Sequence, residues 1–228
     1  CSYLNFQPIV FTPMGSDVII HAQDNFLYKF MAKRAFKNAD IVTGDSKLLQ
    51  KRGLNVGAKM KNNYIIQNGV DSKLFYPKKE LDLKKKLKLK DNELIIFSPR
   101  AITPLYNIEI IIDSLSILKL NNIDFKCLFT FAFGGDYLDS LKKRVRDLNL
   151  EQNIIWLGYA KYNEMAQYYN VSDIIISIPS SDSSPKSVYE AMFCGKPIIV
   201  SDLEWCHEIL SQKNCLHILV EVSNHLFL

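Results

Sequence analysis

The sequence has few cysteines and no pattern that would pair them or use them to hold a metal. Its five cysteines are scattered over 228 residues, and no C-x-x-C pair occurs. Three of them fall in or beside apolar segments, which is more typical of buried free thiols than of disulfides. Free thiols favour a reducing compartment, so we expect a cytoplasmic protein.

Other absences exclude further classes of protein. No apolar run approaches the roughly 18 residues that a membrane-spanning helix needs. No G-x-G-x-x-G follows a predicted strand, which argues against a dinucleotide oxidoreductase. The net charge of +4 is mild, and we expect no nucleic-acid partner. No D-x-D motif ends a strand, and the histidines share no ligand spacing, so we expect neither a metal nor a cofactor. The histidines are His21, His207, His217 and His225.

Apolar residues make up 48% of the chain and charged residues 23%, the balance of a protein with a substantial core. From about residue 93 onward, short runs of Ile, Leu, Val and Phe alternate with amphipathic segments. The predicted strands are 94–100, 125–136, 153–159, 173–180 and 197–202, and helices are predicted between them. Continuous apolar strands separated by helices are typical of a parallel sheet that is buried on both faces. We therefore predict a doubly wound α/β domain.

The first part of the chain also alternates, with predicted strands at 8–12, 17–20, 41–46 and 64–71. Asp45 or Ser46 is the expected cap of the helix that follows the third of these strands. The lysine-rich stretch 79–92 is the best candidate for a junction, although a solvated helix face is an equally good interpretation. The predicted division is 1–78 for the first domain, 79–92 for the junction and 93–228 for the second domain.

A helix predicted over 25–40 places Phe26, Phe30 and Phe36 on one side and its cations elsewhere. An ordinary helix facing the core of the first domain is the commoner use of such a pattern. Peripheral contact with the inner face of an anionic membrane is the alternative that the four cations add.

Ligands of doubly wound sheets bind beyond the carboxyl ends of the strands. At these ends the sequence places Arg100, the pair Gly134-Gly135, the pair Gly158-Tyr159 and the loop 180–187. Arginine and the N–H groups at a helix start both suit phosphate, and glycine lets a ligand approach the backbone. Each feature alone also fits a turn or a surface ion pair. Together they predict a diphosphate site.

The order of motifs resembles glycosyltransferase family 4, the retaining GT-B enzymes, from residue 8 to about residue 210. The specific matches are IIQNGVDSKLFYP (65–77) and SDSSPKSVYEAMFCGKPIIVSD (181–202), and TPMGSDVI, ADIVTGDS and SPRAITPLYN are weaker ones. The resemblance implies two Rossmann-like doubly wound domains that face a cleft. The first would be incomplete, and the chain would be truncated at both ends.

The resemblance also implies residue roles. Arg100 would neutralise the donor diphosphate, Glu190 would accept hydrogen bonds from the ribose, and Asp182 would face the transferred sugar. Asp182 and Arg100 are thus the candidate catalytic residues. The other donor-binding candidates are Gly135, Gly158, Tyr159, Ser184, Pro185, Lys186 and Ser187, and Gly15 and Asp17 are the candidates on the acceptor side.

Two positions depart from the family pattern. Leu105 and Tyr106 stand where a lysine is usual, and Met14 stands where a histidine is common. The implied activity is that of a hexosyltransferase, independent of metal and retaining. It would move a sugar from a nucleoside-diphosphate sugar to a glycan or lipid-linked acceptor. The alternative is an inactive remnant that binds nucleotide sugar, and a truncated chain would hold donor better than it turns it over.

Overall fold

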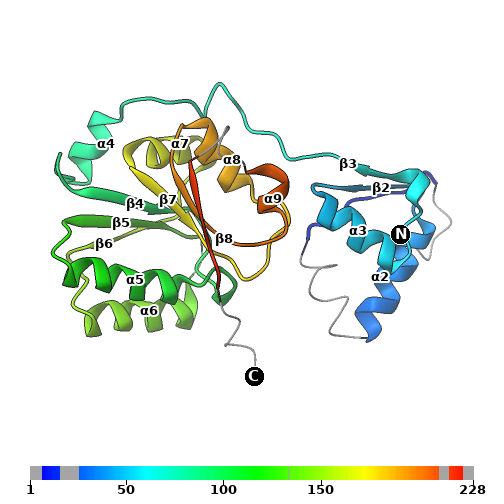
Figure 1. Cartoon of the computed structure of the whole chain (residues 1–228), viewed down its shortest axis with the longest axis horizontal. Coiled ribbons are helices and arrows are strands. Elements are labelled where there is room, and N and C mark those ends of the chain that lie inside the picture. Colours follow the sequence, from blue (N-terminus) through cyan, green and yellow to red (C-terminus); the bar gives the residue numbers. More distant parts are fainter. Residues whose placement is uncertain (1–6, 16–25, 133, 211–215, 223–228) are drawn as a thin grey trace. The chain divides into compact units, whose positions relative to one another are not determined.

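The chain forms two compact units in a computed structural model, which describes residues 7–15, 26–132, 134–210 and 216–222 (Figure 1). The first unit comprises residues 1–69 with the short segments 181–185 and 203–209. The second comprises residues 70–180, 186–202 and 210–228. The division therefore falls after Gly69, whereas we had expected it in the lysine-rich stretch.

The lysine-rich stretch belongs to the second unit, where one of its leucines is buried and where the residues just before it form hydrogen bonds. It contains the short helix α4 (Leu81–Lys86), whose Leu83 is buried. Just before it, Lys78 N donates to Asn170 Oδ1 at 3.0 Å, and Asn170 Nδ2 donates to Tyr76 O at 3.0 Å. Most of its lysines are exposed, as the solvated-helix interpretation expects.

The first unit has a three-stranded parallel sheet in the order β1-β2-β3. Its strands are β1 (Val10–Phe11), β2 (Ile41–Gly44) and β3 (Asn63–Ile65), with α2 (Phe26–Asn38), α3 (Lys47–Val56) and the 3₁₀ turn η2 (Met60–Asn62) between them. Ser46 caps α3, and its Oγ accepts from Leu49 N at 3.1 Å. Of the two predicted caps, the structure therefore uses Ser46. The strand predicted at 17–20 lies outside the described residues.

Helix α2 does not bury the face that its sequence pattern indicated. Phe36 is fully buried beside Ala39, Val42 and Leu49, but Phe26 is 85% exposed and Phe30 is 51% exposed. The three phenylalanines therefore do not share one buried face. Only the C-terminal part of α2 packs on the core of this unit.

The second unit has a six-stranded parallel sheet in the order β6-β5-β4-β7-β8-β9. The strands are β4 (Leu94–Ser98), β5 (Phe125–Thr130), β6 (Ile154–Gly158), β7 (Ile174–Ser177), β8 (Ile198–Ser201) and β9 (His217–Val220). The helices are α5 (Ile108–Leu120), α6 (Gly135–Asp147), α7 (Tyr162–Val171) and α8 (Lys186–Phe193), with a 3₁₀ turn η3 (Pro104–Tyr106) before α5. The short helix α9 (Cys206–Ile209) is counted with the first unit. This arrangement confirms the doubly wound α/β prediction.

Alternation along β4 shows why helices cover both faces of this sheet. Ile96 belongs to the core cluster that α5 and α6 complete, with Ile111, Ile112 and Leu141. Its neighbour Phe97 points the other way and packs against Tyr168 and Tyr169 of α7. Figure 1 shows α5 and α6 on one side of the sheet and α7 and α8 on the other. Cys127, Cys194 and Cys206 are buried free thiols, as expected.

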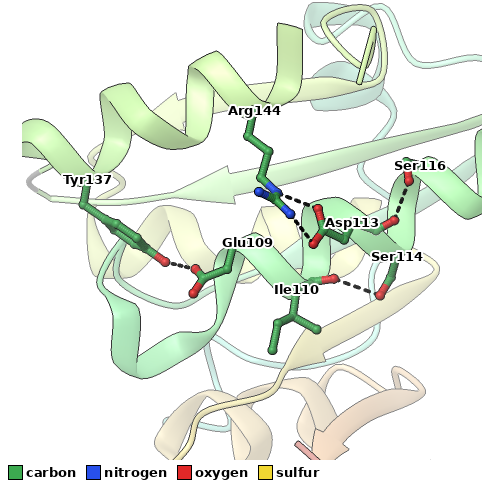
Figure 2. A network of polar contacts seen from close by, with 7 residues as sticks. All are labelled: Glu109, Ile110, Asp113, Ser114, Ser116, Tyr137 and Arg144. Carbon is green, nitrogen blue, oxygen red and sulfur yellow. Dashed lines mark hydrogen bonds and ion pairs between the residues drawn. The ribbon is translucent and has the colours of Figure 1, made fainter. Parts of the chain in front are cut away.

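Polar contacts join α5 to α6 on the outer surface (Figure 2). Arg144 donates to both carboxylate oxygens of Asp113, each at 2.6 Å, and Tyr137 donates to Glu109. Because Arg144 and Asp113 are about half exposed, this pair orders the two helices but adds little to stability.

Candidate functional site

The candidate site lies where the strand order of the second unit reverses. The chain runs from β4 outward through β5 and β6, then returns to β7 on the other side of β4. The segments that follow β4 and β7 are held together at this point. Asn107 Nδ2 donates to Ile178 O at 2.7 Å, and Ser180 N donates to Leu105 O at 2.9 Å. Ligands of doubly wound sheets bind at such a reversal.

Arg100 has a defined position at the end of β4. Its Nη1 donates to Ser187 Oγ at 2.9 Å, and its guanidinium carbon lies 4.2 Å from the centroid of the Tyr106 ring. Stacking on an aromatic face and a hydrogen bond both restrict the guanidinium, which is only half-buried. Tyr106 stands at one of the two positions that lack the family's lysine, so a ring supports Arg100 there instead of a second charge.

Helix α8 starts at Lys186 and brings Ser187 to Arg100. Lys186 is exposed, and its Nζ lies 4.3 Å from the centroid of the Tyr162 ring on α7. The two cations therefore lie close to the start of α8, where the helix dipole also favours an anion. The helix ends in a Schellman motif, in which Gly195 has φ +68° and Lys196 N donates to Ala191 O.

Glu190 is buried on α8 and only 6% exposed. One of its oxygens accepts from the Tyr169 hydroxyl at 2.9 Å. Burial raises the pKa of the Glu190 carboxyl, and the Tyr169 hydrogen bond and the charges of Lys186 and Arg100 act in the opposite direction. Glu190 lies one turn into α8, where its side chain is buried and meets Tyr169 of α7.

The glycine candidates lie at the same edge of the sheet, after strands further from the reversal. Gly135 begins α6 after β5 and has φ +50°, and Gly158 ends β6 with φ +73°. A Cβ at either position would meet nothing within 4 Å, so their backbones border open space. The next residue, Tyr159, is 72% exposed.

The remaining candidates are grouped with the first unit. Asp182 accepts from Ser183 N at 2.9 Å, and the Ser183 hydroxyl donates to Asp45 Oδ2 at 3.2 Å. Burial, together with the charge of Asp182, raises the pKa of Asp45. Ser184 and Pro185 are buried, and so is Gly15, which has φ +107°. Asp17 lies outside the described residues.

The structure thus brings four of the predicted donor-binding residues together in one unit, namely Arg100, Lys186, Ser187 and Glu190. Sequence reasoning missed Tyr106, Tyr162 and Tyr169, which support them. The signal available was weak, because a tyrosine in a helix does not show which residue its ring or hydroxyl contacts. Among the described residues, no three His, Cys, Asp or Glu side chains gather as metal ligands.

Known proteins match both the sequence and the fold. Residues 79–225 match the family described as Glycosyl transferases group 1. The alpha-monoglucosyldiacylglycerol synthase of Streptococcus pneumoniae (strain ATCC BAA-255 / R6) is 26% identical over 133 residues, 58% of this chain and 30% of that protein. The N-acetyl-alpha-D-glucosaminyl L-malate synthase of Bacillus anthracis is 22% identical over 205 residues, 87% of this chain and 52% of that protein.

A solved structure shows the same fold. The Anabaena Alr3699/HepE structure in complex with UDP and glucose superposes with a TM-score of 0.81 at 19% identity, over 94% of this chain and 58% of that one. By length, the matched part of this chain covers 30% and 52% of the two curated relatives named above. Because the family match covers most of the second unit and includes the residues at the strand reversal, this chain belongs to the glycosyl transferases group 1, with their GT-B type of α/β fold.

Proposed function

We propose that this chain carries the donor-binding part of a hexosyltransferase that takes a sugar from a nucleoside-diphosphate sugar and transfers it to a glycan or lipid-linked acceptor. The observation that carries the proposal is the placement of Arg100, Lys186, Ser187 and Glu190 around the start of α8 at the strand reversal. Two cations and a helix start suit a diphosphate, and a buried carboxylate suits hydroxyl donors. The names of relatives and of a UDP complex are consistent with such a donor.

In this reaction the bond between the sugar's anomeric carbon and the diphosphate oxygen breaks, a bond from the acceptor oxygen to that carbon forms, and the proton of the acceptor hydroxyl passes to the leaving diphosphate. Arg100 and the first N–H groups of α8 would stabilise the charge that develops on the leaving diphosphate. Lys186 would add a second positive charge to this stabilisation. In this scheme protein groups alone stabilise the leaving diphosphate, and no metal is needed. Asp182 would face the sugar, whose transition state carries positive charge. Transfer with retention of configuration is part of the proposal.

Transfer of radiolabelled sugar from a nucleotide sugar to lipid and glycan extracts tests the proposal. Because this chain would hold donor better than it turns it over, we expect clear binding of the labelled donor, little label in the acceptor fraction, and the same yields when a chelator is added. Loss of transfer on adding chelator would overturn metal independence. Nucleotide binding without any transfer would favour the alternative, a protein that binds nucleotide sugar but does not transfer it.

A second proposal is peripheral contact of the first unit with an anionic membrane surface. Helix α2 exposes five large apolar side chains in its first six residues, and it carries four cations and no acidic residue. The exposed fractions are 85% for Phe26, 62% for Leu27, 55% for Tyr28, 51% for Phe30 and 51% for Met31. No helix in the described part of the chain is long and apolar enough to span a bilayer. Apolar side chains beside cations are the features that interfacial helices share.

Co-sedimentation with liposomes checks the membrane proposal. We expect the chain to pellet with vesicles that contain phosphatidylglycerol and to stay in solution with phosphatidylcholine vesicles at physiological salt. Replacing Phe26 and Phe30 by serine should reduce pelleting severalfold, because both side chains are exposed and their loss leaves the core of the first unit intact. Equal pelleting of the wild-type chain and this variant would contradict a role for α2.

A further inference from the structure

Tyr169 of α7 is a buried tyrosine whose hydroxyl has a single described partner in the candidate site. Its side chain is fully buried, and its hydroxyl donates to Glu190 Oε2 at 2.9 Å. Burial and the neighbouring carboxylate raise the pKa of Tyr169 well above its ordinary value. The hydroxyl therefore stays protonated and can only donate to the carboxylate across the physiological range of pH.

Two buried phenylalanines fix the position of the Tyr169 ring. The centroid of Phe97 on β4 lies 5.2 Å from that of the Tyr169 ring, at an interplanar angle of 77°. The centroid of Phe75 lies 5.9 Å away, at an angle of 73°. Both phenylalanines are fully buried, and edge-to-face packing of this kind restricts a ring strongly. The hydroxyl of Tyr169 therefore points to one place, the carboxylate on α8.

Glu190 needs such a partner because a glutamate side chain has three torsions and this one is buried. A buried carboxylate without a hydrogen bond is costly and tends to become protonated. The groups that face Glu190 are Tyr169 on α7, Arg100 after β4, Lys186 on its own helix and Cys194 just after that helix. Of these, the structure gives only Tyr169 a direct hydrogen bond to the carboxylate.

We infer that Tyr169 is a positioning residue for donor binding, which holds the charged Glu190 carboxylate in the orientation that accepts hydroxyl groups of the donor. The inference rests on the proposed function, which assigns Glu190 to the donor. Tyr169 itself touches no substrate in this scheme. It acts through one oxygen of Glu190 and leaves the other oxygen for the ligand.

Tyr169→Phe keeps the ring and removes only the hydroxyl, and Tyr168→Phe is the matched control. Tyr168 is the neighbouring residue of α7 and also packs on Phe97, at 5.9 Å between centroids. Affinity for UDP is measured by calorimetry between pH 5.5 and 8. We expect Tyr169→Phe to bind about 3- to 10-fold more weakly at neutral pH, the size of one typical hydrogen bond, because the substitution removes the support of Glu190 and no contact with the donor itself. Tyr168→Phe should bind as the wild type does.

The pH profile separates positioning from a general loss of structure. The Tyr169 hydrogen bond lowers the pKa of Glu190, so its removal raises that pKa further. The fall in UDP affinity on acidification should therefore begin at a higher pH in Tyr169→Phe than in the wild type. Carbon-13 NMR of the labelled glutamate carboxyls, with Glu190→Gln to assign the signal, reads the same shift without any nucleotide.

The outcomes distinguish this inference from the proposed function. If wild-type chain binds neither UDP nor the other common nucleoside diphosphates, the proposed function fails and the role of Tyr169 in donor binding fails with it. If the wild type binds UDP but Tyr169→Phe has the same affinity and the same Glu190 titration, only the positioning role is overturned. Weaker binding with an unchanged Glu190 titration would also overturn it, because the effect would then not pass through Glu190.

Discussion

Arg100→Ala should weaken binding of UDP or the preferred nucleoside diphosphate by about 30- to 150-fold, which corresponds to about 2–3 kcal/mol for a lost charge-assisted hydrogen bond to phosphate. The expected loss is large because Arg100 is ordered before any ligand arrives. Ser187 Oγ and the Tyr106 ring hold the guanidinium from two sides. Little conformational entropy is therefore left to lose on binding. Isothermal titration calorimetry on the purified chain measures the change.

Arg144→Ala is the matched control for Arg100→Ala. Arg144 is also paired through its guanidinium, but with Asp113 on the surface of α5. Its removal should leave nucleotide affinity unchanged and should lower the free energy of unfolding by at most about 1 kcal/mol. Glu190→Gln alone should also weaken nucleotide binding, as Arg100→Ala alone does. Unchanged affinity in both of these single variants would refute this donor site.

Phe97→Ala should lower the free energy of unfolding of the second unit by about 3–5 kcal/mol. Phe97 is fully buried on β4, next to the strand reversal, and it packs against Tyr168 and Tyr169. Truncation would leave a cavity between the sheet and α7, because strand and helix backbones are held by their own hydrogen bonds and cannot close over it. Urea unfolding followed by circular dichroism gives the change in free energy.

The control for Phe97→Ala is Phe193→Ala at the end of α8. Phe193 is 46% exposed, so the same truncation should cost less than about 1 kcal/mol. Phe97→Ala should also weaken nucleotide binding, since the Tyr169 ring would lose one of the two phenylalanines that hold it. Similar destabilisation by the two substitutions would show that Phe97 is not a core contact of this kind.

The sequence by itself determined the architecture of the second unit. Runs of Ile, Leu, Val and Phe separated by amphipathic segments are typical of strands whose side chains are buried on both faces of a sheet. These strands form the parallel sheet of the second unit. Local chemistry was equally readable where it depends on neighbours in the chain. The cap of α3 is such a case: the sequence indicated Asp45 or Ser46, and the Ser46 hydroxyl accepts from the N–H group three residues away.

The strand order of the sheet explains why the candidate residues, which are far apart in the sequence, lie together. Because the strands are parallel and the order reverses beside β4, residues after β4 and β7 must meet at one edge. Arg100 and Ser187 lie far apart in the sequence, yet this topology alone indicated that they would lie together. Their direct hydrogen bond is the result.

Only the tertiary structure decided the features that depend on packing between distant elements. A sequence pattern does not say which face of α2 finds a partner, and Phe26 and Phe30 remain exposed because only Phe36 reaches the core of the first unit. Likewise, strand β9 is short and had not been predicted, and it exists because β8 offers it a parallel edge.

Tyr169 shows the same limit at the candidate site. Its spacing places it on the buried side of a helix, which predicts only that its ring is covered. That its hydroxyl meets the Glu190 carboxylate depends on how α7 and α8 pack against β4. Hydrogen bonds between side chains of separate helices depend on distances of a few tenths of an ångström. Periodicity fixes the face on which a residue lies, but the three-dimensional packing decides which atom it meets.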